Sequence, residues 1–200
     1  MVKIKRKELR TFINRSFCIA SEHGFHDETR SDAHYLMLVL SEVGEMVEAD
    51  RKNRRAARNK MEQVMSLDAA AKNSFDHYFE LYVKDTLEDE LADVCIRLFD
   101  WCGARDIEPW TIGGETVDMT KEFKDIFGNM TVCEQCFWLS CMVTNLRDVW
   151  DDDDRLSQEI SSLLSFCFEF AHFHGIPLRW HIRQKMRYNA NREQRHGKGY

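Results

Sequence analysis

Residues 87–97 of the chain read LEDELADVCIR, and residues 40–49 read LSEVGEMVEA. Each stretch carries two carboxylates three residues apart inside an apolar, helix-patterned run. Positions i and i+3 project from the same face of a helix, so Glu42 pairs with Glu45 and Glu90 pairs with Asp93. The apolar neighbours indicate that these acidic faces are partly buried. Clustered buried carboxylates repel one another and are costly to desolvate, so the pattern predicts a bound cation.

The composition favours an all-α fold. The 200 residues suit one domain, and a hydrophobic content of 44% is enough for a sizeable core. Two prolines and nine glycines are few, which argues against a β-sandwich or barrel. The basic run at 51–55 would complement the dipole at the end of a helix. Apolar periodicity predicts helices over residues 6–22, 32–51, 74–101, 130–150, 155–173 and 177–193, with 56–73 helical in part and 103–120 as a connection.

Charge and cysteine usage exclude several classes of protein. The net charge of −6 argues against a non-specific nucleic-acid binder. No apolar run approaches the length of a membrane span, and the basic N-terminus lacks the apolar stretch of a signal peptide. The seven cysteines are an odd number and mostly fall in helical apolar patterns, as reduced core residues do. We therefore expect a cytoplasmic protein without a nucleic-acid or membrane partner.

The chemistry of the four acids suits magnesium. Mg²⁺ prefers hard oxygen ligands in octahedral geometry and usually shares itself between carboxylates, waters and substrate phosphates. Two facing helices that each contribute two acids would hold one or two such ions, which can bind a triphosphate and activate water. The alternative is that the acids lie on solvated helix faces. Two acidic pairs on consecutive helices, each framed by core residues, make this alternative the weaker one.

The same motifs resemble a known superfamily. Residues 42–49 followed by 90–94 resemble the ExxE…ExxD signature of the all-α nucleoside triphosphate pyrophosphatases, which include MazG-like proteins, helical dCTP pyrophosphatases and dimeric dUTPases. Residues 185–192, KMRYNANR, resemble the last helix of that family, where a Lys…Asn…Arg series faces the nucleotide. The resemblance implies a helical bundle of MazG-like type. It also implies Mg²⁺-dependent hydrolysis of a nucleoside or deoxynucleoside triphosphate to monophosphate and pyrophosphate.

The resemblance also implies a set of metal and catalytic residues. One of the glutamates, or Glu48, would orient or deprotonate the attacking water. Mn²⁺ is an alternative to Mg²⁺ at such a site. The metal ligands that the resemblance implies are Glu42, Glu45, Glu90 and Asp93.

A second set of residues is predicted to bind the substrate. The resemblance implies that Lys185 and Arg192 meet phosphates and that Asn189 meets the sugar or base. Arg97 lies one turn after Asp93, where it could hold a phosphate or form a salt bridge to a site carboxylate. Two loop residues before the first acidic helix could contact a base or simply cover the core. The predicted substrate-binding residues are Arg97, Lys185, Asn189, Arg192, Phe25 and His26.

The chain departs from the simplest family members in two ways. The long gap between the acidic pairs predicts an insertion over about residues 51–80. The basic helix follows a second segment that matches the first weakly: shifted by 69 residues, Leu87 and Glu90 meet Leu156 and Glu159. In that second segment Cys141, Thr144 and Ser162 occupy the other acidic positions.

These matches suggest a tandem pseudo-dimer with an acidic metal-site half, 1–112, and a degenerate second half, 113–200, that ends in the basic helix. Helical amphipathicity alone can also produce such matches. The basic helix could therefore serve the acidic site of its own chain, the site of a partner in a homodimer, or neither.

Two further readings belong to other classes. The chain could be a non-catalytic helical protein that binds a nucleotide or a partner. A di-iron carboxylate bundle is the other, because residues 169–172 form an ExxH motif; such a bundle needs a second motif, and residues 193–196 in the tail supply the only other one. The CxxC at residues 133–136 has no second copy and is more typical of helix packing than of zinc binding.

Overall fold

The computed structural model describes residues 4–67, 74–109, 125 and 127–193. All regular secondary structure in these residues is helical, which confirms the predicted all-α class. The helices are α1 (Arg6–Glu22), α2 (Asp32–Arg51), α3 (Arg58–Leu67), α4 (Phe75–Tyr82), α5 (Leu87–Arg105), α7 (Val132–Asn145), the 3₁₀ turn η2 (Leu146–Asp148), α8 (Asp153–Phe173) and α9 (Leu178–Asn191).

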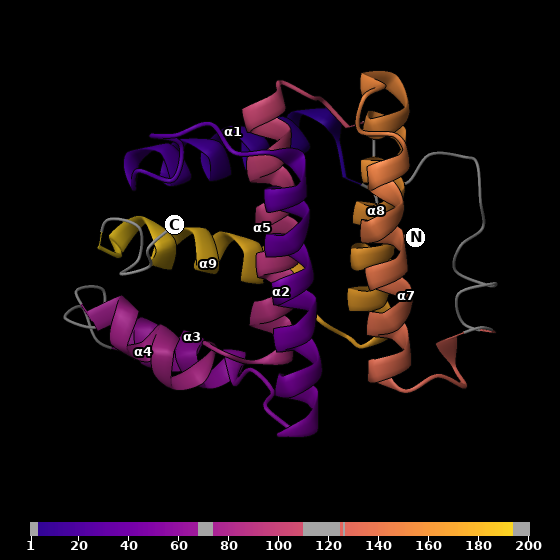
Figure 1. Cartoon of the computed structure of the whole chain (residues 1–200). Coiled ribbons are helices and arrows are strands. Elements are labelled where there is room, and N and C mark those ends of the chain that lie inside the picture. The colour runs from indigo at the N-terminus through magenta and orange to yellow at the C-terminus, as the bar shows by residue number, and fades with distance from the viewer. Residues whose placement is uncertain (1–3, 68–73, 110–124, 126, 194–200) are drawn as a thin grey trace.

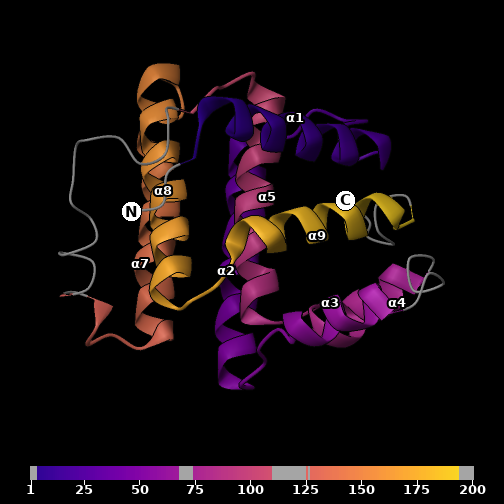
Figure 2. The same cartoon turned by 180° about the vertical axis from the view of Figure 1, so that it is seen from behind.

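Helices α2 and α5 form the central pair of the bundle. They run antiparallel, with α7 and α8 on one side and α1, α9 and the α3–α4 segment on the other (Figure 1). The view from behind shows α9 crossing α5 between α1 and α3 (Figure 2). Helix α5 contacts α1, α2, α8 and α9, and α2 also contacts α7. The two acidic stretches therefore lie in the middle of the molecule.

Apolar spacing explains the central pair. Val43 and Met46 in α2 and Leu91 and Val94 in α5 are at most 2% exposed. Each such side chain contributes roughly 1.5–3 kcal/mol by leaving water, and this contribution stabilises the central pair. A smaller aromatic cluster joins α4 to α9, where the rings of Phe79 and Tyr188 stack at 4.7 Å between centroids.

The prediction of one continuous helix over residues 74–101 is wrong, because a turn at residues 83–86 separates α4 from α5. Asp85 adopts a left-handed conformation with φ 59°, and the hydroxyl of Thr86 accepts a hydrogen bond from the Asp89 N–H. A left-handed residue followed by a threonine cap ends one helix and starts another. The segment predicted as partly helical, 56–73, contains α3, and its residues 68–73 lie outside the described part.

The end of α5 also differs from the prediction. The helix passes through Gly103 and ends at Arg105, where Asp106 takes the left-handed cap position with φ 53°. Gly103 has a packing role, because an added Cβ would lie 2.5 Å from the Cβ of Phe17 in α1. The predicted connection over 103–120 therefore starts later, and its residues 110–120 lie outside the described part.

The second half of the chain starts as an antiparallel pair. Helix α7 ends at Asn145 and continues into η2, so the prediction of one helix to residue 150 is correct only in part. Helix α8 follows after a cap in which the Asp152 carboxylate accepts from the Arg155 N–H. Helix α9 then leaves this pair and packs on α5, α1 and α4. The proposed division at residue 112 stays a prediction.

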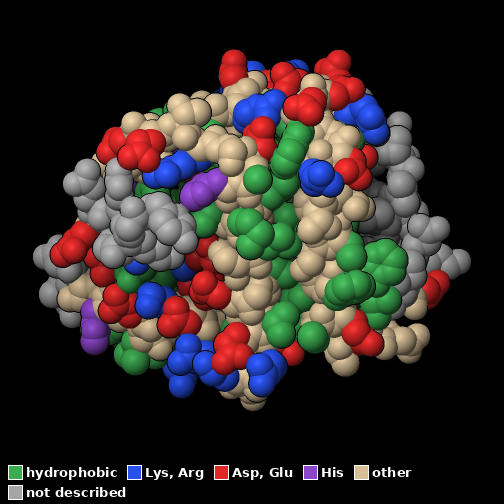
Figure 3. All heavy atoms as spheres, viewed as in Figure 1, with side chains coloured by type: hydrophobic (Ala, Val, Ile, Leu, Met, Phe, Trp, Pro, Cys, Tyr) green, Lys and Arg blue, Asp and Glu red, His purple; other side chains and the backbone are tan. Residues whose placement is uncertain are grey.

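One face of the bundle carries exposed apolar side chains. Met37 in α2 and Phe137 and Trp138 in α7 are 61%, 67% and 51% exposed. Figure 3 shows hydrophobic side chains gathered over α2 and α7 on this face. Among the described helices, none combines the length and apolar character that crossing a lipid bilayer requires.

Candidate metal centre

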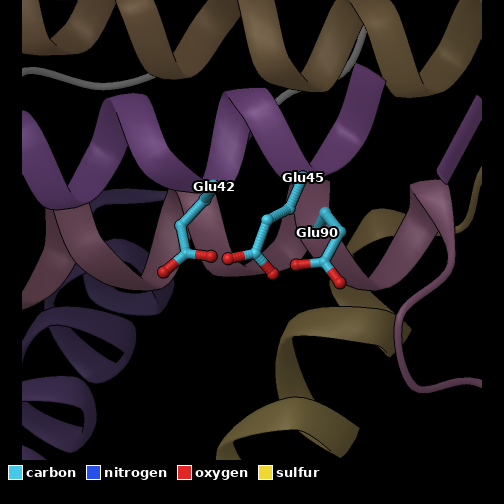
Figure 4. Close-up of side chains that lie close together, drawn as sticks. All are labelled: Glu42, Glu45 and Glu90. Atoms are coloured by element: carbon cyan, nitrogen blue, oxygen red, sulfur yellow. The ribbon is translucent and has the colours of Figure 1, made fainter. Parts of the chain in front are cut away.

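Three of the four predicted acids converge between α2 and α5. One oxygen each of Glu42, Glu45 and Glu90 lies within 4.8 Å of the other two. The three side chains point the same way, with Glu42 and Glu45 from α2 and Glu90 from the neighbouring turn of α5 (Figure 4). Glu42 and Glu90 are only 5% and 3% exposed, whereas Glu45 is open to solvent. The group is thus buried on one side and accessible on the other.

The local sequence explains this convergence. Ser31 caps α2 by accepting from the His34 N–H, and Thr86 caps α5 just before its acidic turn. The spacing of three residues places Glu42 and Glu45 on one face of α2. Because α5 runs antiparallel and close to α2, its first turns bring Glu90 to that face.

The electrostatics of the group favour a cation. Burial, followed by the charge of Asp93, raises the pKa of Glu90 to about 9. Burial and Asp93 also raise the pKa of Glu42, although Arg97 opposes this shift. Within the described residues, neither Glu45 nor Glu90 forms an ion pair. A divalent ion would stabilise the anionic forms that burial disfavours.

Asp93, the fourth predicted ligand, is bound to a lysine of α9. The ammonium of Lys185 lies 2.7 Å from Asp93 Oδ2 and 2.6 Å from Asp89 Oδ2. The basic C-terminal helix therefore reaches the acidic helix of its own chain. In this structure Lys185 neutralises carboxylates, and its predicted contact with a phosphate stays a prediction.

Asp89 is a site residue that was not predicted from the sequence. Its side chain is fully buried, and it also accepts a hydrogen bond from the Asp85 N–H at 3.1 Å. The signal in the sequence was its spacing: Asp89 precedes Asp93 by four residues and so shares its helix face. An acid in the middle of a run of acids gave no further reason to choose it.

Arg97 forms a salt bridge to a site carboxylate, which was one of its two predicted roles. Its Nε donates to Glu42 Oε1 at 2.9 Å, so the arginine holds one oxygen of a predicted metal ligand. It also lines a small cavity of about 30 Å³ between α1, α5 and α9. A space of this size holds about one water molecule. The other residues that line it are Ser16, Ile19, Ala20, Phe25, Ile96, Asp100, Met186 and Asn189.

Two polar atoms at this cavity lack partners. Among the described residues, neither Ser16 Oγ nor Asn189 Oδ1 has a hydrogen-bond partner, although both atoms are buried. Buried polar atoms are normally satisfied by protein, water or ligand. Phe25 lines the cavity, whereas His26 lies with Nε2 2.8 Å from Asp100 Oδ1 and Nδ1 3.3 Å from the Tyr35 hydroxyl.

A groove of about 170 Å³ opens beside the acids and adds two cations. Glu45, Glu48 and Glu90 line it together with Lys52 and Arg54. Glu48 is exposed and lies 2.8 Å from Lys52 Nζ, and this hydrogen bond lowers the pKa of Glu48. Lys52 and Arg54 belong to the basic run at residues 51–55, which was expected to complement the helix dipole. Their place beside the acids depends on how the chain turns after α2, which the spacing did not show.

Arg192 is the C-cap residue of α9, and its side chain packs beside an aromatic ring. Its guanidinium lies 5.7 Å from the centroid of the Tyr188 ring, and its carbonyl oxygen lies 3.0 Å from His23 Nε2. The predicted role of Arg192 toward a phosphate stays a prediction.

The second helix pair has no equivalent group. Glu159 and Ser162 in α8 and Thr144 in α7 are exposed, and Cys141 is half-buried. Within the described part of the chain, the trio of Glu42, Glu45 and Glu90 is the one group of three or more potential ligands close enough to share an ion. Residues 169–172 thus join no such group, and the other ExxH motif ends at residue 196, outside the described part.

No family model, no curated protein and no solved structure matches the chain. The class of protein is therefore defined by the fold and the site: an all-α bundle with a half-buried carboxylate trio, two neighbouring cations and a small cavity bordered by two buried polar atoms.

Proposed function

We propose that the protein is a Mg²⁺-dependent nucleoside triphosphate pyrophosphohydrolase, which converts an NTP or dNTP to the monophosphate and pyrophosphate. The observation that carries the proposal is the convergence of Glu42, Glu45 and Glu90 beside a groove that presents Lys52 and Arg54. Acids for a metal and cations for phosphates within one groove are what a triphosphate–metal complex requires. The expected setting is the cytoplasm, where such an enzyme would clear unwanted nucleotides.

The residues fit a magnesium ion by their chemistry. Three carboxylate oxygens lie within 4.8 Å of one another, and burial raises the pKa of Glu90, so the metal-free group is poorly satisfied. Glu42, Glu45 and Glu90 would hold the ion, with Mn²⁺ as an alternative. When bound, the ion supplies neutralisation of the triphosphate charge and activation of water.

Side chains at the groove would bind the phosphates and accept a proton. Lys52 and Arg54 bind phosphate oxygens at the groove, since both are half-exposed and, among the described residues, each pairs with an exposed acid. Glu48, at the same groove, accepts the proton of the attacking water. This carboxylate is ionised at neutral pH, as a general base must be, although Lys52 lowers its pKa and so makes it a weaker base.

The nucleoside part of the substrate would bind at the small cavity that Arg97 lines. The unsatisfied atoms Ser16 Oγ and Asn189 Oδ1 provide polar contacts for a sugar or base, and Phe25 provides an aromatic wall. Because the cavity is only about 30 Å³, side chains that line it must move aside when a nucleoside enters. His26 supports this wall through its contact with Asp100.

The test is a panel of canonical and modified nucleoside triphosphates with Mg²⁺ or Mn²⁺, with pyrophosphate release as the readout. We expect release from at least one nucleotide and its loss in Glu90→Gln. No release across the panel, together with no metal-dependent shift in Tm, would overturn the proposal.

A non-catalytic nucleotide-binding protein is the second candidate. The observation that favours it is Lys185, which forms an ion pair with Asp93, the fourth metal ligand that the family resemblance implies. This candidate predicts that a nucleotide raises Tm without any pyrophosphate release.

A homodimer is part of the proposal as well. Exposed Phe137 and Trp138 on α7, with Met37 on α2, offer an apolar face of the kind that subunits cover. Light scattering of the purified chain tests this assembly, and a monomer at high concentration argues against it.

A further inference from the structure

Lys185 sits between two carboxylates in the way that a bridging metal ion would. Its Nζ lies 2.6 Å from Asp89 Oδ2 and 2.7 Å from Asp93 Oδ2. The lysine side chain is 7% exposed, and those of Asp89 and Asp93 are 1% and 15% exposed. The two acids are four residues apart on α5, so the ammonium links consecutive turns of the helix.

The packing of α9 fixes the ammonium in this place. Ile182 and Met186, which flank Lys185 in α9, are fully buried, and the Phe79 ring centroid lies 5.8 Å from Nζ. Asp89 Oδ1 has no hydrogen-bond partner in the described residues, so the ion pair is the main compensation for this buried acid. A buried charge that loses its partner is strongly destabilising, and Lys185 is therefore held at Asp89.

The charge balance leaves room for one divalent ion. Five carboxylates meet here, and they carry a formal charge of minus five when all of them are ionised, as they must be to bind a metal ion: Glu42, Glu45, Asp89, Glu90 and Asp93. Lys185 and Arg97, through their ion pairs, reduce this to minus three. One divalent ion leaves the group slightly negative, whereas a second would have to share Asp93 with the fixed ammonium.

We infer that Lys185 takes the place of a second metal ion, so that the site binds a single divalent ion through Glu42, Glu45 and Glu90. Asp93 stays with Lys185 and acts as a positioning residue, in contrast to the ligand role that the ExxD motif implies. The inference deepens the proposed function and rests on it for the identity of the metal ligands.

The test uses Mn²⁺ alone as the probe, with the full chain and no nucleotide. Calorimetry and electron paramagnetic resonance are expected to give one ion per chain. Glu90→Gln should weaken Mn²⁺ binding by more than about 100-fold, because a ligand is lost. Asp93→Asn should weaken it by less than about 10-fold, because only a nearby charge is lost. Two ions of similar affinity in the wild type, or equal losses in the two variants, would overturn the inference.

The variant Lys185→Met provides a readout that a purely structural role would not change. Removal of the ammonium frees Asp89 and Asp93, so the number of Mn²⁺ ions per chain should rise from one to two. A folded variant that still binds one ion contradicts the inference. If circular dichroism shows that Lys185→Met does not fold, the comparison of Asp93→Asn with Glu90→Gln decides.

The inference and the proposed function fail in different ways. A single Mn²⁺ with intact binding in Asp93→Asn, but no pyrophosphate release from any nucleotide, leaves the inference standing and removes the enzyme. Pyrophosphate release together with two equivalent Mn²⁺ ions leaves the enzyme standing and removes the inference.

Discussion

The helix pairs α2–α5 and α7–α8 contact each other along the bundle, yet matched positions in the two pairs differ in burial and in their ion pairs. Glu90 in α5 is 3% exposed, whereas Glu159, its match in α8, is exposed. Asp93 is half-buried and bound to Lys185, whereas its match Ser162 is exposed. The acidic helix differs because α1 and α9 cover it, and α9 brings a cation. The acidic stretch of α5 is therefore a candidate site because α1 and α9 cover it and bury its carboxylates.

The largest expected effect separates Glu90 from Glu159. If the proposed function is correct, Glu90→Gln should lower the rate of pyrophosphate release by at least about 1,000-fold, since a metal ligand is lost. The matched control Glu159→Gln should change it by less than about 2-fold. Both variants need assay at saturating Mg²⁺ on the best nucleotide of the panel. Similar losses in both would show that the two pairs do not differ in function.

The packing of α5 on α1 can be tested with two glycines. Gly103→Ala places a Cβ 2.5 Å from the Phe17 Cβ, and this atom cannot rotate away. We expect the free energy of unfolding to fall by about 3 kcal/mol. Gly44→Ala in α2 is the control, because no atom lies within 4 Å of the added Cβ there. It should gain up to about 1 kcal/mol, as alanine favours a helix. Urea unfolding measures both changes, and equal losses would contradict the close approach of α5 to α1.

The sequence predicted the class of fold and the shared helix face of Glu42 and Glu45, because helical spacing depends only on local pattern. It predicted a site of four acids, of which the structure brings Glu42, Glu45 and Glu90 together. It did not predict the break at Asp85, since a residue in the left-handed conformation is not visible in apolar periodicity. The sequence also did not predict the ion pair of Lys185 with Asp89 and Asp93. That contact joins residues almost a hundred positions apart and depends on how α9 crosses α5.

The helix that covers the acids should carry its own pH dependence. Burial, and then the charge of Arg58, lowers the pKa of His181 in α9 to about 4. In the unfolded chain this pKa is about 6.5, so between these values the unfolded state binds more protons and stability rises with pH. The stabilisation present at pH 7 is therefore lost as the pH falls from about 6.5 to about 4, by about 3 kcal/mol.

Thermal unfolding from pH 4 to pH 7 measures this loss. His181→Gln should flatten the profile, whereas His172→Gln, at an exposed position of α8, should leave the profile as in the wild type. A profile for His181→Gln that is as steep as that of the wild type would assign the acid sensitivity to other groups.

The smallest expected effect concerns how α5 and α7 begin. The hydroxyls of Thr86 and Thr131 each cap a helix by accepting a backbone N–H, from Asp89 and Glu134 respectively. Replacement of either threonine by alanine should cost about 1 kcal/mol of stability. The two variants should differ at the metal, because the Thr86 cap orders the turn that holds Asp89 and Glu90. We expect Thr86→Ala to weaken Mn²⁺ binding by about 3-fold, with no change in Thr131→Ala. Equal Mn²⁺ affinities in the two variants would mean that α9, through Lys185, orders the acidic turn without help from its cap.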